Sequence, residues 1–130
     1  MRRTPIALAG IALTAGLALA VAAGPATAKD GDVLVAGRCT HSSTSKLRLS
    51  EEDGRIEVEF EVDQNRNGVR WTVALSRDGR RIARLARTTR PPSGSFEARI
   101  VTANRAGADV ISGRAVSSSG EICRARATFG

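Results

Sequence analysis

The stretch that most constrains the fold runs from Arg55 to Leu75 and contains two apolar runs with a period of two. In RIEVEFEV the apolar residues alternate with glutamates, and in VRWTVAL they alternate with polar or small residues. This is the period of a β-strand with one face buried and one face in water. We expect the two runs to pair as a β-hairpin with an even loop, either Asn67-Gly68 or 65–68, because only an even loop places both apolar sets on one face.

A single hairpin is marginally stable in water, so its apolar face needs a second layer. Six other short segments have strand character, and turn residues separate them. They are 33–40, 46–50, 81–88, 95–101, 110–117 and 121–129. No sustained helical period occurs after residue 28. The sequence therefore predicts an all-β protein, an antiparallel immunoglobulin-like (Greek-key) sandwich of about seven to eight strands.

The N-terminus has the pattern of a secretory signal peptide. Two arginines in MRRT precede an apolar run over 6–23 and a small-residue site, Ala26-Thr27-Ala28. We expect a helical signal peptide over 1–28, cleavage after Ala28 or, as alternatives, after Ala23 or not at all, a flexible leader over 29–36 and a β-sandwich domain over 37–130. Such a protein would be extracellular and have no membrane segment after cleavage.

The chain contains two cysteines, Cys39 and Cys123. In an exported protein this count predicts one disulfide, which would tie the first strand to the last. Reactive thiol chemistry is the alternative, but the two residues lack CxxC spacing.

Basic residues exceed acidic ones. The chain has 20 Lys and Arg against 13 Asp and Glu. Cleavage after Ala28 would remove two arginines and no acid, so the mature chain would have a net charge of +5. In the last hairpin a three-residue loop, 118–120, would place Ala115 beside Cys123 and Arg114 opposite Arg124. Arg126 follows on the same face, and we place Arg99 on the next strand.

Like charges placed opposite each other are unfavourable unless an anion lies between them. The anion would be an internal acid, such as Glu97 or Glu121, or an external polymer. The chain has no tyrosine and one tryptophan, so it lacks a stacking platform for nucleic-acid bases or sugars, and no specific nucleic acid is expected.

Three further patterns have ordinary structural explanations. Asp63, Asn65 and Asn67 match the opening of a calcium loop, but Ala74 stands where a bidentate acid belongs, so a plain turn is expected and calcium is the weaker alternative. His41 is the only histidine and is expected on a solvent-exposed loop.

The row Glu57, Glu59 and Glu61 is expected on a solvated sheet face, with Arg70 or an arginine of a neighbouring strand as partner. We predict no catalytic residue, cofactor or metal.

Several runs resemble an uncharacterised family of small secreted actinobacterial β-sandwich proteins. They are KLRLSEEDGRIEVEFEVDQNRNG-x-x-W, TTRPPSGSFE, the ANRAG loop and the cysteine pair, which together cover most of 39–123. The resemblance implies secretion and the sandwich fold, but no activity and no site residues.

Taken together, the sequence predicts a non-enzymatic secreted sandwich that binds an anionic cell-wall or extracellular partner through its basic face. The alternative is a protein-directed module such as a protease inhibitor, which would insert a stiff loop, 88–95 or 65–68, into a partner's cleft. The oligomeric state is left open.

Overall fold

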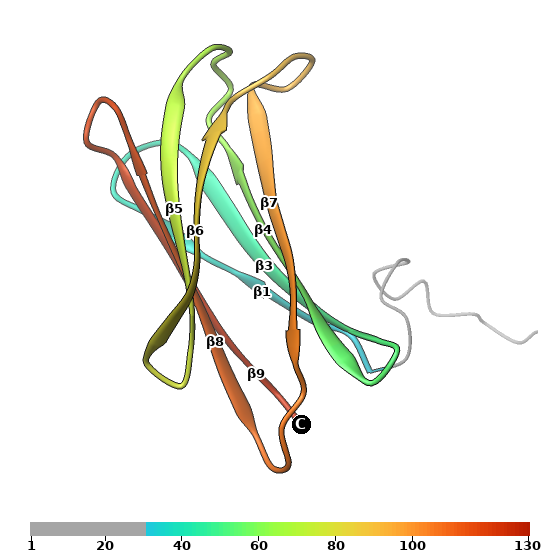
Figure 1. Ribbon diagram of the computed structural model, residues 1–130. Helices are drawn as coiled ribbons and strands as arrows, with labels where there is room; N and C mark the ends of the chain where they lie inside the picture. Colours follow the sequence, from blue (N-terminus) through green and yellow to red (C-terminus); the bar gives the residue numbers. More distant parts are fainter. Residues whose placement is uncertain (1–30) are drawn as a thin grey trace, which may run out of the picture.

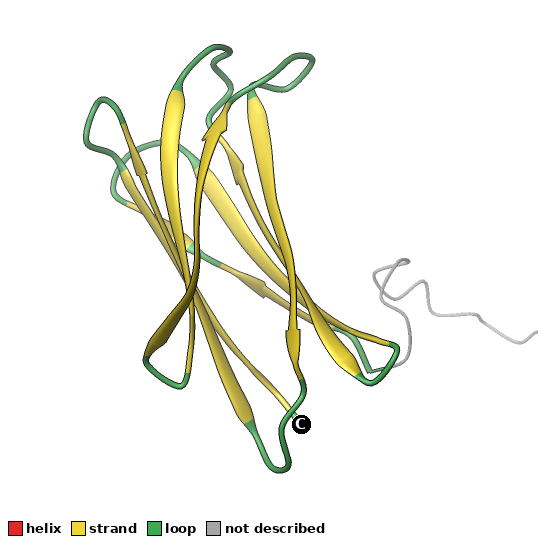
Figure 2. Ribbon diagram, viewed as in Figure 1, coloured by secondary structure: helices red, strands yellow, loops and turns green. Residues whose placement is uncertain are grey.

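The structure of the protein, a computed structural model, describes residues 31–130, and its secondary structure consists of strands (Figure 2). Residues 31–130 form nine strands, whose arrangement in space can be followed in Figure 1. They are β1 (Val33–Ala36), β2 (Arg38–Cys39), β3 (Thr44–Glu52), β4 (Arg55–Asp63), β5 (Arg70–Arg77), β6 (Arg80–Thr88), β7 (Ser95–Ala103), β8 (Asp109–Ser117) and β9 (Ile122–Phe129). The signal peptide predicted over 1–28 lies outside the described residues. Among residues 31–130 there is no helix of the length and apolarity needed to cross a membrane.

The strands form two antiparallel sheets packed face to face. One has four strands in the order β1-β3-β4-β7, and the other has five in the order β2-β9-β8-β5-β6. The core lies between them because the alternating apolar residues of both sheets point inward. Its largest fully buried side chains are those of Trp71 and Phe60. The all-β sandwich predicted from the sequence is therefore confirmed.

The predicted hairpin between the two alternating runs is wrong. β4 pairs with β3 and β7, whereas β5 pairs with β6 and β8 in the other sheet. The apolar faces of β4 and β5 do meet, but across the core rather than side by side. Loop 64–69 carries the chain from one sheet to the other. Alternation alone could not distinguish the two arrangements, since either one buries the same side chains.

Gly37 divides the predicted first strand into β1 and β2. β1 pairs with β3 in the four-stranded sheet, and β2 pairs with β9 in the five-stranded sheet. A Cβ atom at Gly37 would lie 2.6 Å from the carbonyl oxygen of Arg124, so the chain can change sheets here only with glycine. This split raises the number of strands to nine. It also corrects the flexible leader expected over 29–36, since 33–36 form a paired strand and the sandwich begins at Val33.

The remaining connections follow the turn residues. The β8–β9 hairpin has the predicted register, with Ala115 opposite Cys123, and Gly120 adopts a positive φ of 91°. Asp78 and Gly79, both with positive φ, form the turn between β5 and β6. In this hairpin Leu75 lies opposite Ala83, and a bulge occurs at Leu75/Ser76. Residues 89–94 connect β6 of the five-stranded sheet to β7 of the four-stranded sheet.

Candidate functional site

The outer face of the five-stranded sheet is covered by arginines. Along each strand the residues that alternate with the core residues point outward, and in this sheet many of them are basic. We define the basic face as the seven exposed arginines at outward positions of these strands. They are Arg38, Arg70, Arg81, Arg84, Arg114, Arg124 and Arg126.

Strand pairing brings four of these arginines into one row across the sheet. Arg124 lies opposite both Arg38 and Arg114. Ala74 of β5 is paired with Arg114 on one side and with Arg84 on the other. The row therefore runs Arg38, Arg124, Arg114, Ala74, Arg84. Since neighbouring strands lie about 4.8 Å apart, it spans about 19 Å between the outermost backbone positions.

Within the part of the chain that the structure describes, the basic face has no acidic partner. Asp109 is the one acidic residue in the strands of this sheet, and it is 1% exposed and accepts a hydrogen bond from the backbone of Arg105. Among residues 31–130, none of the seven arginines takes part in an ion pair. The two acids that the sequence offered as internal partners lie elsewhere. Glu97 is on β7 of the other sheet, and Glu121 is buried.

A shallow hollow of about 750 Å³ lies on this face. Its lining includes four arginines of the basic face and three small side chains of the adjacent strands. These residues are Arg38, Arg114, Arg124, Arg126, Ala74, Ser76 and Ser112. The small side chains lower the surface next to the guanidinium groups, so that an anion can approach several of them at once.

Arg99 does not belong to this cluster, contrary to its predicted position. It lies on β7 in the four-stranded sheet, opposite Glu59 of β4. Its guanidinium group lies 2.7 Å from the carboxylate of Glu57 and 4.0 Å from that of Glu59. Arg99 is thus neutralised by the carboxylates around it, and we remove it from the candidate anion site.

The outer face of the four-stranded sheet is a network of ion pairs. Besides Arg99, Lys46 pairs with Glu61, and Arg48 pairs with Glu59 and with Asp32. The pKa of Glu57 is lowered to about 2, mainly by the hydrogen bond that Arg99 donates. The glutamate row is therefore a solvated face with cross-strand partners, as predicted. Its partners come from β3 and β7, whereas Arg70 lies on the other sheet.

The disulfide between Cys39 and Cys123 is present, and its Cα atoms are 4.0 Å apart. The two residues lie directly opposite each other on β2 and β9, so the bridge joins neighbouring strands of one sheet. It ties β2 rather than the first strand, β1, to the last strand. The bridge also holds Arg38 opposite Arg124. Arg38 directly precedes Cys39 on β2, Arg124 directly follows Cys123 on β9, and the two strands are antiparallel.

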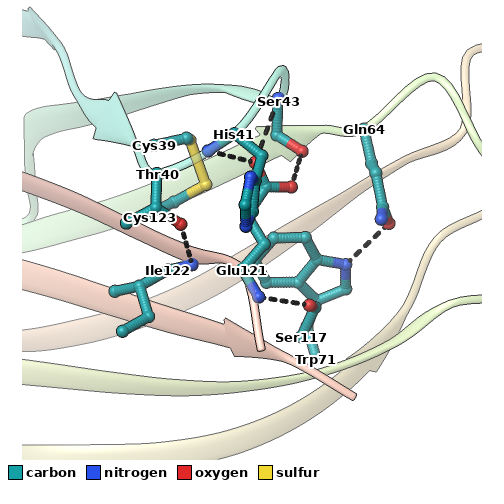
Figure 3. Close-up of a disulfide and its surroundings, with 10 residues drawn as sticks. All are labelled: Cys39, Thr40, His41, Ser43, Gln64, Trp71, Ser117, Glu121, Ile122 and Cys123. Carbon is teal, nitrogen blue, oxygen red and sulfur yellow. Dashed lines mark hydrogen bonds between the residues drawn. A yellow bond between two sulfur atoms is a disulfide. The ribbon is translucent and has the colours of Figure 1, made fainter. Parts of the chain in front are cut away.

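Glu121 organises the loop after the disulfide (Figure 3). Its carboxylate accepts hydrogen bonds from the backbone of His41 and Ser43 and from the Ser43 hydroxyl. Only the backbone of His41 contributes to these contacts, and the residue itself is exposed, as predicted. Ser43 is buried, and both its backbone and its hydroxyl are bound to the carboxylate of Glu121. This cluster therefore orders loop 40–43.

The loop considered for calcium is a turn with its own hydrogen bonds. The carboxylate of Asp63 accepts a hydrogen bond from the backbone of Asn65, 3.0 Å away, and Asn65 and Gly68 have positive φ. Loop 90–94 packs against it, since Gln64 donates a backbone hydrogen bond to Gly94. These contacts account for Asp63 and Asn65 structurally, and Asn67 is part of the same turn.

No protein-family model, curated protein or solved structure matches this chain. The candidate site therefore depends on geometry alone. The sequence indicated Arg114, Arg124 and Arg126 but missed Arg38 and Arg84, which complete the row. Both are outward positions in strands rich in arginine, but their row could be identified only after the pairing of β2 with β9 and of β5 with β6 was known.

Proposed function

We propose that this protein is a secreted, non-enzymatic β-sandwich that binds an anionic polymer at or outside the cell wall through its basic face. The observation that carries the proposal is that, among residues 31–130, no strand of this sheet has an exposed acid, whereas its outer face has seven exposed arginines. Uncompensated positive charge raises the local concentration of polyanions and speeds their association. The disulfide is compatible with an extracellular location. An immunoglobulin-like Greek key is the finer fold that we propose, supported by the pairing of the non-consecutive strands β5 and β8.

The arrangement of Arg114 and Arg124 costs stability, which supports a binding role. Like charges directly opposite each other on neighbouring strands destabilise a sheet by about 0.2–1 kcal/mol. Threonine suits an exposed strand position. We therefore expect Arg124→Thr to raise the free energy of unfolding at low salt by several tenths of a kcal/mol and at the same time to weaken polyanion binding. If Arg124 had a purely structural role, its replacement would not increase stability and weaken binding at the same time.

Binding to heparin and to isolated anionic wall polymer tests the function. A variant with Arg114, Arg124 and Arg126 changed to Gln should lose most of the binding seen at low salt. The matched control changes Arg66, Arg90 and Arg105, three exposed loop arginines, to Gln, which alters the net charge equally. This control should retain most of the binding. Binding of the wild type should also fall steeply with salt, because exposed charges are screened within about 10 Å at 0.1 M.

Two results would refute the basic face as the binding surface. One is the absence of binding at low salt, and the other is an equal loss in both triple variants, which would indicate an effect of net charge alone.

A second candidate function, protease inhibition, is favoured by one observation. Loops 64–69 and 89–94 support each other through backbone hydrogen bonds from Gln64 to Gly94 and from Gly68 to Thr89, and Arg66 is exposed on the first loop. A rigid loop loses little entropy when it enters a cleft. Incubation with trypsin-like and subtilisin-like proteases tests this candidate. Cleavage at Arg66 or Arg90 without inhibition excludes it.

A further inference from the structure

We infer that the ligand is a linear chain of phosphate or sulfate groups without aromatic bases, and that it lies across the strands along the row from Arg38 to Arg84. This inference rests on the proposed function and adds to it the orientation, the length and the chemical class of the ligand. An even distribution of arginines would instead predict binding in any direction.

The first argument is the contrast between neighbouring rows. The adjacent row of outward residues is uncharged and partly apolar. It consists of Thr40, Ile122, Val116, Thr72 and Ala86. The row on the other side has serines at its centre, Ser112 and Ser76, between Arg126 and Arg81. Positive charge is therefore most continuous across the strands, at the level of Arg114.

The second argument is the shape of the surface at Ala74. The row has four arginines, and its one uncharged position, Ala74, carries the smallest side chain of the five. Ala74 lines the hollow together with Arg38, Arg114 and Arg124. A chain held by these three arginines can therefore pass over Ala74 close to the sheet and reach Arg84 on the edge strand β6.

The third argument is the chemistry of the contacts. Guanidinium groups on neighbouring strands are close enough for one tetrahedral oxyanion to accept hydrogen bonds from two of them, and bidentate contacts of this kind favour arginine over lysine. The basic face has no aromatic residue on which a base could stack. Phosphate and sulfate chains without bases therefore fit this face better than single-stranded nucleic acid does.

Inorganic polyphosphate of graded length is the probe for the row, with heparin as the sulfate arm and polyglutamate as the carboxylate arm. At low salt the affinity should rise steeply with length until the chain spans about 19 Å, and only slowly beyond that. Heparin should bind in the same row and polyglutamate more weakly. Single-stranded DNA that binds more tightly than polyphosphate of equal charge would overturn the assignment of a base-free chain.

A substitution that leaves the net charge unchanged tests whether the ligand lies along the row. Ala74→Phe places a large ring in the row, and Thr72→Phe places the same ring on the same strand, one row away. Ala74→Phe should weaken the binding of long polyphosphate at least tenfold, whereas Thr72→Phe should change it less than twofold. Thermal unfolding of both variants establishes that they fold alike. If one does not, Ala74→Leu and Thr72→Leu provide the same comparison with a smaller side chain.

A second pair tests the far end of the row. Arg84→Gln should weaken the binding of long chains about fivefold and leave short chains unaffected, as expected for one exposed charge contact. Arg80→Gln, at an exposed position of the same strand outside both the row and the basic face, should change either affinity less than twofold. One outcome is that the triple variant of Arg114, Arg124 and Arg126 abolishes binding while the two members of each pair behave alike. In that case the ligand does not lie along the row, but the basic face is still the binding surface. If no polyanion binds, both proposals fail.

Discussion

Removal of the disulfide should destabilise this protein strongly, and the size of the effect follows from the structure. Cys39 and Cys123 are 84 residues apart in the chain. A cross-link over such a loop removes conformational entropy from the unfolded chain that corresponds to about 4–5 kcal/mol. A domain of about a hundred residues has a total stability of about 5–15 kcal/mol, so the bridge supplies a large fraction of it.

The perturbation is the double variant with Cys39 and Cys123 changed to Ala, compared with the reduced wild type. Since 1 kcal/mol corresponds to about 4–8 °C in a domain of this size, the melting temperature should fall by about 20 °C or more. Urea unfolding should also give a steeper dependence on denaturant, because an unfolded chain without the bridge exposes more surface. Both quantities are measurable by circular dichroism.

The control is to add the same reductant to the double variant, which should leave its melting temperature unchanged. A fall of less than about 5 °C in both the double variant and the reduced wild type would refute the argument from loop closure. Two reactive thiols in the native, oxidised protein would refute the bridge itself.

Three further predictions concern single positions. Gly37→Ala would place a Cβ atom 2.6 Å from the backbone oxygen of Arg124, so the free energy of unfolding should fall by at least about 2 kcal/mol in urea titrations. Phe60→Ala, at a fully buried position, should lower it by about 3–5 kcal/mol. The carboxylate of Glu57 should titrate near pH 2 by NMR, and Arg99→Gln should raise its pKa toward the ordinary value. Because the folded pKa is lowered, the contribution of Glu57 to stability is present above about pH 4.5 and is lost as the pH falls toward 2.

Strand positions and local turns could be predicted because they depend on residues close in sequence. The β8–β9 hairpin shows this best. A small-residue pattern on both strands and a glycine at the left-handed position allow one register, and the structure has that register. The turn at Asp78-Gly79 was predictable for the same reason. The position of the bulge beside it could not be predicted, since Ile82 and Ala83 both pack against the core and the alternation gives no unique pairing there.

Sheet membership could not be predicted in the same way. Alternation shows which side chains face inward, but two strands that face each other across a core have the same pattern as two strands that pair side by side. Arg99 was misplaced for this reason. Its outward direction was correct, but β7 pairs with β4 rather than with β8 or β9. Gly37 was missed because its φ is ordinary, and it is the close approach of Ser45 and Arg124 from other strands that requires a glycine.

The crossing of loop 64–69 also explains why a basic face exists at all. Had β4 and β5 paired as the predicted hairpin with loop 65–68, Asp63 would lie opposite Arg70, and the glutamate row would share a surface with arginines of the other strands. Instead the strands of the four-stranded sheet contain seven acidic and four basic residues, while those of the five-stranded sheet contain ten arginines and one acid. The core separates the two sets by about 10 Å, the usual distance between packed sheets. The glutamates therefore cannot form contact ion pairs with the outward arginines, and within residues 31–130 these arginines take part in no ion pair.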